Sequence, residues 1–413
     1  MNLVPQQYTL SNGNSLYGFQ SGTLDLLKLD FSFEAGFAYQ PQKMCAVAAN
    51  KLFTEASMHQ SVQQVAEFFD YRGIAVEQNT DIFTGVLSVY TLRRYAEELF
   101  PLLAELFTEP AFPQREFEVF CDKRRQQLRS NFQRTNYVAR NLFYEALYGN
   151  SHPMGAYAKP DSIDRLSLSS VKDFYRDHYR LSKAHLVLSG NYDDTLLKTY
   201  DRWFGQDRQS GVGRKSVTDY PVSPEMTAQP CKVFQPIPQA VQSSIRIGRV
   251  LPFCWNDIDY ARFMVLNTIL GGYFGSRLMS NIREDKGYTY GIYSQTQIFR
   301  GCIVFFIVAD VGGDVSQEAV EEVYKEIERL QTEPIPTDEL DVVRHYMEGD
   351  FVRSIDGIFE CSERYRQMFA TDVDESFTDN YFEAIRTVTP QQLMQLAQQV
   401  LRRDQLVEVV VGK

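Results

Sequence analysis

The stretch GGYFGSRLMSNIREDKGYTYGIYSQ, residues 271–295, carries turn, helix and strand signals in quick succession. The segment SRLMSNIRED has helical spacing, with Leu278 and Ile282 on one face and Ser276 as the expected N-cap. We expect that helix to end at Gly287, because glycine readily adopts the left-handed conformation of a C-cap. The stretch therefore predicts a helix, a tight glycine turn and a following strand.

The strand after the turn, YTYGIYSQTQI, alternates with period two. This alternation predicts Tyr288, Tyr290 and Ile292 on one face and Tyr293 on the other. Arg283, in the last helical turn, and Tyr290 are then expected to converge beside the turn. A guanidinium and a phenol together can donate hydrogen bonds to a peptide carbonyl or an oxyanion. By spacing alone, a structural role is the favoured interpretation of the pair, because an arginine at a helix end complements the helix dipole and tyrosines are common in half-buried strands.

The chain contains an internal repeat. The tripeptide Thr-Glu-Pro follows an apolar helical run at residues 108–110 and again at 332–334, an offset of 224 residues, and a proline-marked helix start follows each copy. A second landmark is an amphipathic helix, a polar turn and an apolar strand ending in glycine, at Gly190 and at Gly412, an offset of 222 residues. Two independent landmarks that agree this closely indicate two tandem homologous halves.

Each half shows alternating strands such as LLKLDFSFEAG and SSIRIGRVL, then a helix, more strands and long helices. Because strands and helices are segregated, we expect an α+β fold in which each half is an antiparallel-rich sheet packed with helices. The predicted boundaries are 1–205 for the N-terminal half and 227–413 for the C-terminal half. Between them, residues 206–226 are rich in glycine, serine and proline, which is typical of a linker.

Composition excludes several classes of partner. A chain of 413 residues exceeds what one hydrophobic core usually fills. Its net charge of −11 argues against nucleic acid or an anionic membrane as a partner, because such partners need basic patches. The six cysteines are dispersed without a CxxC pair, as expected for thiols in a reducing compartment. With no signal peptide and no apolar run of membrane-spanning length, a cytoplasmic location is expected.

The segment LGGYFGSRLMSNIREDKGYTYGIYS closely resembles the C-terminal-half signature of the pitrilysin/insulinase family, the inverted-zincin peptidases. The segments YTLSNG, FEAG and DFYRDHYRLSKAHLVLSGNY and the tandem halves are also similar to that family, so the resemblance extends from Tyr8 to Gly412. It implies a pitrilysin-like, two-domain fold that forms half of a clamp. In the family, an arginine and a tyrosine of this block enter the active site of the other half or subunit and bind the substrate carbonyl; these positions fall on Arg283 and Tyr290.

The zinc motif of the family is degenerate in this chain. Active members carry HxxEH on a helix, which supplies two zinc ligands and a general base, and a distal glutamate ligand. The resemblance places Ala46 and Asn50 at the histidine positions, Ala49 at the base position and Gln127 at the distal ligand. Alanine cannot bind zinc, and neutral amides are poor ligands beside imidazole and carboxylate. We therefore expect no metal in this chain and a zinc ion in a partner subunit.

The segment QNTDIFTGVLSVY resembles the region where the family pairs an extended peptide by β-addition, which makes Asp81 and Thr84 candidate substrate-binding residues. A strand that simply follows a turn is the alternative interpretation of this segment.

Together these features predict a subunit that is not an enzyme on its own. It would pair with an HxxEH-bearing subunit as a heterodimeric zinc metallopeptidase, bind peptide substrates in a closed chamber and supply Arg283 and Tyr290 to the partner's site. Two alternatives stay open: a catalytically dead structural or assembly protein, and a homodimeric peptide-binding clamp. A zinc-independent peptidase is disfavoured, because no Ser/His/Asp or Cys/His arrangement stands out.

Overall fold

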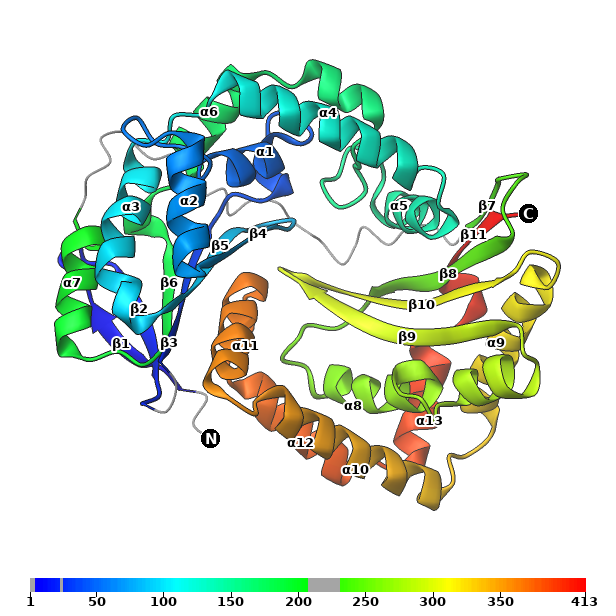
Figure 1. Cartoon of the computed structure of the whole chain (residues 1–413). Coiled ribbons are helices and arrows are strands. Elements are labelled where there is room, and N and C mark those ends of the chain that lie inside the picture. Colours follow the sequence, from blue (N-terminus) through cyan, green and yellow to red (C-terminus); the bar gives the residue numbers. More distant parts are fainter. Residues whose placement is uncertain (1–3, 23–24, 207–230) are drawn as a thin grey trace. The chain divides into compact units, whose positions relative to one another are not determined.

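The computed structural model describes residues 4–22, 25–206 and 231–413 and divides the chain into two compact units (Figure 1). The first unit comprises the described parts of 1–129, 158–219 and 354–367, and the second those of 130–157, 220–353 and 368–413. Each unit holds one β-sheet packed with helices, which confirms the α+β fold class. The predicted linker, 206–226, lies outside the described residues except for Gln206.

The described residues of the first unit form a six-stranded sheet, in which β2 and β6 are parallel to each other and the other neighbours are antiparallel. Their spatial order is β1 (Gln6–Thr9), β2 (Ser15–Gln20), β6 (His185–Gly190), β3 (Leu26–Phe33), β5 (Gly85–Leu92) and β4 (Ala75–Thr80). The α-helices that the N-terminal half contributes to this unit are α1 (Cys45–Leu52), α2 (Val62–Arg72), α3 (Ala96–Thr108), most of α4 (Gln114–Asn131), α6 (Leu168–His178) and α7 (Asp194–Phe204). In this order β3 is a central strand and β4 lies at an edge.

The central strand β3 is buried on both faces, and the two faces differ in chemistry. On one face Phe31 and Phe33 contact the ring of Phe107 in α3, with ring centres 4.8 and 5.7 Å apart. The opposite face carries Lys28, Asp30 and Ser32, all of them buried. The predicted period-two alternation is therefore present, but it separates an apolar core from a buried polar face rather than from solvent.

In the part of the second unit that the structure describes, the sheet has five strands; β7 and β11 are parallel to each other and the other neighbours are antiparallel. Their order is β7 (Lys232–Pro236), β11 (Val407–Gly412), β8 (Gln242–Leu251), β10 (Cys302–Gly312) and β9 (Thr289–Phe299). The α-helices after β8 that lie almost entirely in this unit are α8 (Ile258–Asn267), α9 (Ser316–Thr332), α10 (Thr337–Ser354), α12 (Ser376–Thr387) and α13 (Pro390–Val400). The order β11-β8-β10-β9 repeats the order β6-β3-β5-β4, as tandem homologous halves require. No helix within the described ranges is long and apolar enough to cross a bilayer.

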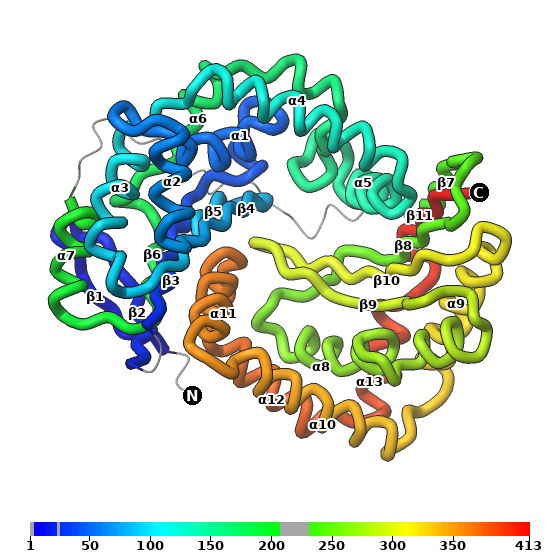
Figure 2. The backbone as a smooth tube through the Cα atoms, in the orientation of Figure 1, coloured from blue at the N-terminus to red at the C-terminus, as the bar shows by residue number. Residues whose placement is uncertain are grey.

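Each compact unit contains one helix from the opposite half of the sequence, a path that can be followed in the backbone tube of Figure 2. Helix α5 (Thr135–Tyr148) packs on β8 and β11 of the second unit, where the Tyr144 hydroxyl donates to Gln297 Oε1 at 2.9 Å. The first part of α11 (Ile358–Thr371) belongs to the first unit, where Cys361 packs against Phe19 and Val187. The predicted boundaries of the two homologous halves, 1–205 and 227–413, refer to the sequence repeat and stay a prediction.

Close packing between the end of α8 and β9 depends on Gly271, which lies in a π-helical turn, Thr268–Gly272. A Cβ atom at Gly271 would lie 2.6 Å from the Ser294 nitrogen and 2.7 Å from its Oγ. Beside it, Asn267 Nδ2 donates to the Ser294 carbonyl at 3.3 Å, and Ser294 Oγ donates to the Asn267 carbonyl at 3.1 Å. The glycine thus lets the helical backbone lie directly on the strand that carries Tyr290.

We predict that Gly271→Ala lowers the free energy of unfolding by about 1–3 kcal/mol, because the added methyl group collides with strand backbone. Gly272→Ala is the matched control, since its nearest neighbour would be a side-chain atom at 3.2 Å. Thermal unfolding of both variants provides the measurement. Equal midpoints for the two variants would contradict the close-packing role of Gly271.

Candidate functional site

The helix of the 271–295 stretch begins directly after Ser276 and is π-helical over Met279–Asp285. The Lys286 nitrogen accordingly donates to the Asn281 carbonyl, five residues earlier, at 3.0 Å. The predicted side-chain cap by Ser276 is wrong, because its hydroxyl is buried without a hydrogen-bond partner. The predicted glycine end is confirmed: Gly287 has φ +68°. Single π-helical turns are frequent at functional sites, because the extra residue per turn redirects side chains.

Tyr290 lies in a β-bulge at the start of β9. The register with β10 shifts there, so that Asp310 alone lies opposite Tyr290 and Gly291. Thr289 Oγ1 donates to the Asp310 carbonyl at 2.6 Å beside the bulge. As a result Tyr290 is 93% exposed, whereas Ile292 is 1% exposed. The prediction that these two side chains share a face is wrong, because the extra residue breaks the alternation and turns Tyr290 outward.

Arg283 stacks on an aromatic ring, and its hydrogen-bond donors meet no acceptor among the described residues. Its guanidinium carbon lies 4.5 Å from the ring centre of Phe274, whose side chain is 63% exposed. No ion pair or hydrogen bond joins the Arg283 side chain to another residue that the structure describes, and the same holds for the Tyr290 hydroxyl. The turn between them is closed by a hydrogen bond from the Tyr288 nitrogen to the Ile282 carbonyl, 3.0 Å. One turn of the second unit is therefore flanked by two side chains whose donors have no partner in the described part of the chain.

The residues of the degenerate zinc motif on α1 are buried in the first unit, where α1 contacts the sheet. Ala46 and Ala49 are fully buried, and Asn50 is buried as well. Asn50 Nδ2 lies within hydrogen-bond distance of three acceptors on β4 and β5, namely the Asn79 carbonyl at 2.6 Å, Thr80 Oγ1 at 3.1 Å and the Val86 carbonyl at 3.2 Å. The position that the resemblance assigns to a zinc ligand thus ties α1 to the sheet.

The distal motif position, Gln127, lies on the exposed side of α4, where its Oε1 accepts a hydrogen bond from Arg124 at 2.7 Å. Burial lowers the pKa of Arg124, but the side chain stays a cation and would repel a metal ion. Within the described part of the chain no group of three or more His, Cys, Asp or Glu side chains could hold a metal.

Asp81 and Thr84 close the turn between β4 and β5. Asp81 Oδ1 accepts from the Phe83 nitrogen at 2.8 Å and from the Thr84 nitrogen at 2.6 Å, and Thr84 Oγ1 donates to Asp81 Oδ2 at 2.7 Å. These side chains therefore have a clear local role, and their contact with a substrate stays a prediction. The turn shapes the end of β4, the edge strand of the sheet.

Comparison with known proteins assigns the family. Residues 165–347 match the family described as "Peptidase M16 inactive domain". The "Uncharacterized zinc protease YmxG" of Bacillus subtilis is 20% identical over 358 residues, 85% of this chain and 84% of that protein. The "Probable inactive metalloprotease YmfF" of the same organism is 20% identical over 307 residues, 72% and 70% of the two chains. The chain is a member of the pitrilysin (peptidase M16) family.

Solved structures agree with this assignment at the level of the fold. The crystal structure of a peptidase M16 inactive domain from Pseudomonas fluorescens superposes with a TM-score of 0.83 at 20% identity, covering 99% of this chain and 98% of that one. The two tandem sheets with their helices are therefore the fold of this pitrilysin-family chain, and the resemblance drawn from the 271–295 stretch is confirmed.

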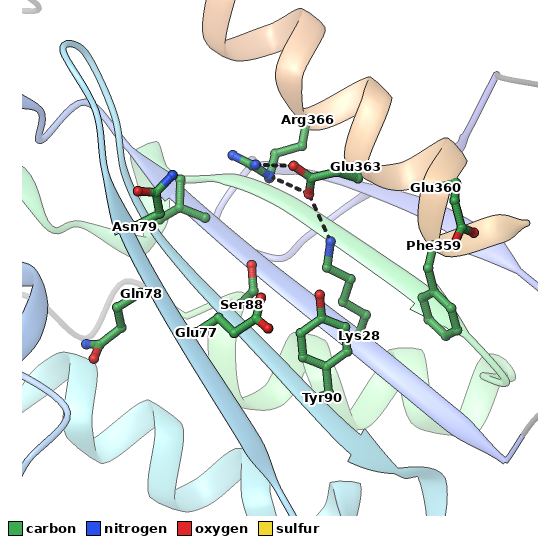
Figure 3. A pocket seen from close by; sticks show the side chains of 11 residues that line it. Lys28, Glu77, Gln78, Asn79, Ser88, Tyr90, Phe359, Glu360, Glu363 and Arg366 are labelled. Atoms are coloured by element: carbon green, nitrogen blue, oxygen red, sulfur yellow. Dashed lines mark hydrogen bonds and ion pairs between the residues drawn. The ribbon is translucent and has the colours of Figure 1, made fainter. Parts of the chain in front are cut away.

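A buried charge network of the pitrilysin-family chain lies on the polar face of β3 (Figure 3). Lys28, only 2% exposed, has its Nζ 3.2 Å from Asp30 Oδ2 and 3.1 Å from Glu363 Oε2. Ser88 donates to the other oxygen of Asp30, and Arg366 binds both oxygens of Glu363. Helix α11 is thereby tied to the sheet by charge-assisted hydrogen bonds.

Burial and neighbouring charges act against each other in this network. Burial lowers the pKa of Lys28, but the carboxylates of Asp30 and Glu363 outweigh it and raise that pKa overall. Burial likewise raises the pKa of Glu363, but the hydrogen bonds and charges of Arg366 and Lys28 lower it to about 2. For the fully buried Asp30 the burial effect prevails, and its pKa is raised. Because the pKa of Glu363 lies near 2, this carboxylate is ionised at neutral pH and pairs there with Lys28 and Arg366.

Sequence reasoning missed this network, although one signal was present. In LLKLDFSF two charged side chains alternate within an otherwise apolar strand, and a charge in a buried strand requires a partner. The partner could not be identified from the pattern, because Glu363 is 335 residues away from Lys28.

We predict that Asn50→Ala lowers the free energy of unfolding by about 1–3 kcal/mol, because the acceptors on β4 and β5 lose a buried donor. Gln127→Ala, at an exposed position of the same degenerate motif, is the control and should leave stability unchanged. Urea unfolding measures both, and elemental analysis should find no stoichiometric zinc in either variant or in the parent. A tightly held equivalent of zinc in the parent would contradict the structural role of the motif.

We predict that Glu363→Gln destabilises the chain by about 1–2 kcal/mol at pH 7, allowing for solvent screening of a side chain that is 35% exposed. Because the folded-state pKa of Glu363 is depressed from 4.5 to about 2, its contribution is complete above about pH 4.5 and is lost as the pH falls towards 2. The stability difference between parent and variant, measured by urea unfolding from pH 3 to pH 7, should shrink accordingly. Glu360→Gln, one turn earlier on α11, should show no such difference; a pH-independent gap for Glu363→Gln would refute the ion-pair role.

Proposed function

We propose that this pitrilysin-family chain is the non-catalytic subunit of a two-chain zinc metallopeptidase. The partner subunit carries HxxEH and holds the zinc ion, and this chain donates hydrogen bonds from Arg283 and Tyr290 to the scissile carbonyl of a peptide and to its tetrahedral oxyanion. The observation that carries the proposal is the state of these two side chains: both are presented by distorted secondary structure with no partner for their donors among the described residues.

The geometry suits oxyanion stabilisation. Donors that are held in place before the reaction stabilise developing charge without reorganising, and this contribution is usually large. The guanidinium of Arg283 makes a cation–π contact with the ring of Phe274, and this contact leaves its N–H groups available as donors. The β-bulge holds Tyr290 outward in the same way, with backbone and Thr289 bonds that leave the phenol free.

The rest of the chain supports a division of labour between two subunits. Ala46, Ala49 and Asn50 serve packing and sheet contacts on α1, so the zinc and its general base come from the partner. The relative YmfF is itself named a probable inactive metalloprotease. All six cysteines are free thiols, in keeping with the cytoplasmic location that we include in the proposal.

The test begins with native co-purification of the tagged chain at its own expression level. We expect a pitrilysin-family chain with HxxEH and a distal glutamate to accompany it, and the pair to cleave peptides. In that pair, Arg283→Ala and Tyr290→Phe should each lower kcat by about 10²–10³-fold, the usual cost of one oxyanion donor, with unchanged assembly.

Tyr71→Phe is the matched control, because Tyr71 is an 84% exposed tyrosine on α2 of the first unit. It should leave kcat unchanged. Full activity of both site variants would disprove the role of Arg283 and Tyr290 in trans. Recovery of the chain alone, or only with copies of itself, would instead favour the homodimeric clamp or the assembly protein.

A further inference from the structure

The polar face of the first sheet carries a cavity of about 570 Å³ beside the charge network (Figure 3). Strands β3, β4 and β5 form its floor, with Lys28, Glu77, Ser88 and Tyr90, and the start of α11 forms a wall. All lining residues belong to the first unit, because the segment 354–367 is part of it. The cavity is therefore a feature of one compact body and has the size of a small-ligand or side-chain site.

The charges inside the cavity do not all cancel. Of its two cationic side chains, Lys28 lies at ion-pair distance from Asp30 and Glu363, and Arg366 lies at ion-pair distance from Glu363. Two further lining carboxylates, Glu77 and Glu360, have no ion pair or hydrogen bond to any residue that the structure describes. The cavity thus presents an uncompensated negative charge that a cation would complement.

Two aromatic rings add a second recognition element. Tyr90 and Phe359 line the same cavity, and the Tyr90 ring centre already lies 5.7 Å from the ammonium of Lys28. Aromatic faces attract guanidinium and ammonium groups and pack well against their aliphatic stems. A small metal cation would make no use of these rings, whereas a long basic side chain would.

The strand register shows that the cavity lies on a face shared by β4, the edge strand of the sheet. Glu77 of β4 lies opposite Ser88 of β5, and Tyr90 of β5 lies opposite Lys28 of β3, so these side chains share one face. Because β4 is the edge strand, an extended peptide that pairs with it would place every second side chain over that face. A basic residue at such a position would reach the unpaired carboxylates.

We propose that this cavity is a specificity pocket for an arginine or lysine side chain of a bound peptide, whose charge pairs with Glu77 and Glu360 and whose stem packs on Tyr90 and Phe359. That the cation belongs to a peptide depends on the peptide-binding function proposed above. The pocket then selects peptides by a basic residue, independently of the donors Arg283 and Tyr290 in the second unit.

The test uses the purified full-length chain and a fluorescent extended peptide with one arginine, compared with the same peptide carrying glutamine. The parent chain should bind the arginine peptide more tightly, and the preference should weaken as salt is raised. Glu77→Gln and Glu360→Gln should each weaken binding of the arginine peptide by about two- to fivefold, as for partly exposed charge pairs, and leave the glutamine peptide unaffected. Glu97→Gln, an exposed glutamate at the start of α3, removes the same charge and should change nothing.

Equal affinity for the two peptides, or equal effects of Glu97→Gln and Glu77→Gln, would overturn the pocket. Free arginine and spermidine form a further arm: if either displaces the peptide at an equal concentration, the occupant is a small cation and the peptide assignment is wrong. The outcome is separable from the subunit proposal. If Arg283→Ala lowers kcat but the chain shows no preference for the arginine peptide, only the pocket proposal is disproved. If the chain prefers the arginine peptide but recruits no zinc subunit, only the two-subunit proposal is disproved.

Discussion

The central strand β3 must be buried on both faces, and much of the first unit follows from that constraint. Its apolar face closes the core against α3, whereas its other face holds Lys28 and Asp30, buried ionisable groups that need opposite charges or hydrogen-bond partners. Those partners come from α11, through Glu363 and Arg366. The ion pair between Lys28 and Glu363 thus helps to hold α11 on this face, beside the polar cavity.

In the second unit, Arg283 and Tyr290 lie in positions where their hydrogen-bond donors have no partner among the described residues. An extra residue has been accommodated on each side of the glycine turn, as a π-helical segment before it and a β-bulge after it. Both distortions break hydrogen-bond regularity locally and redirect a side chain. Regular structure would have placed Tyr290 on the same face as Ile292, within the packed layer.

The hydrophobic pattern was sufficient for the helix, the turn at Gly287 and the strand that follows, because these depend on neighbours in sequence. It also identified the repeated halves, whose sheets share one strand order. The pattern gave a wrong face for Tyr290 and a wrong capping role for Ser276, because neither a β-bulge nor a hydroxyl that makes no hydrogen bond leaves a periodic signal. The pairing of Lys28 with Glu363 was beyond reach for another reason: a single sequence contains no information about which distant charges meet.

The place of α5 and α11 has a consequence for how the chain acquires its structure. Each sheet packs with a helix encoded in the opposite half, so neither half of the sequence contains all the surface needed to bury its own strands. During synthesis the first unit stays incomplete until the segment 354–367 has left the ribosome, long after its last strand, β6, has been made. The first unit can therefore be completed only after nearly the whole chain has been made, because a helix that packs on its sheet is encoded close to the C-terminal end.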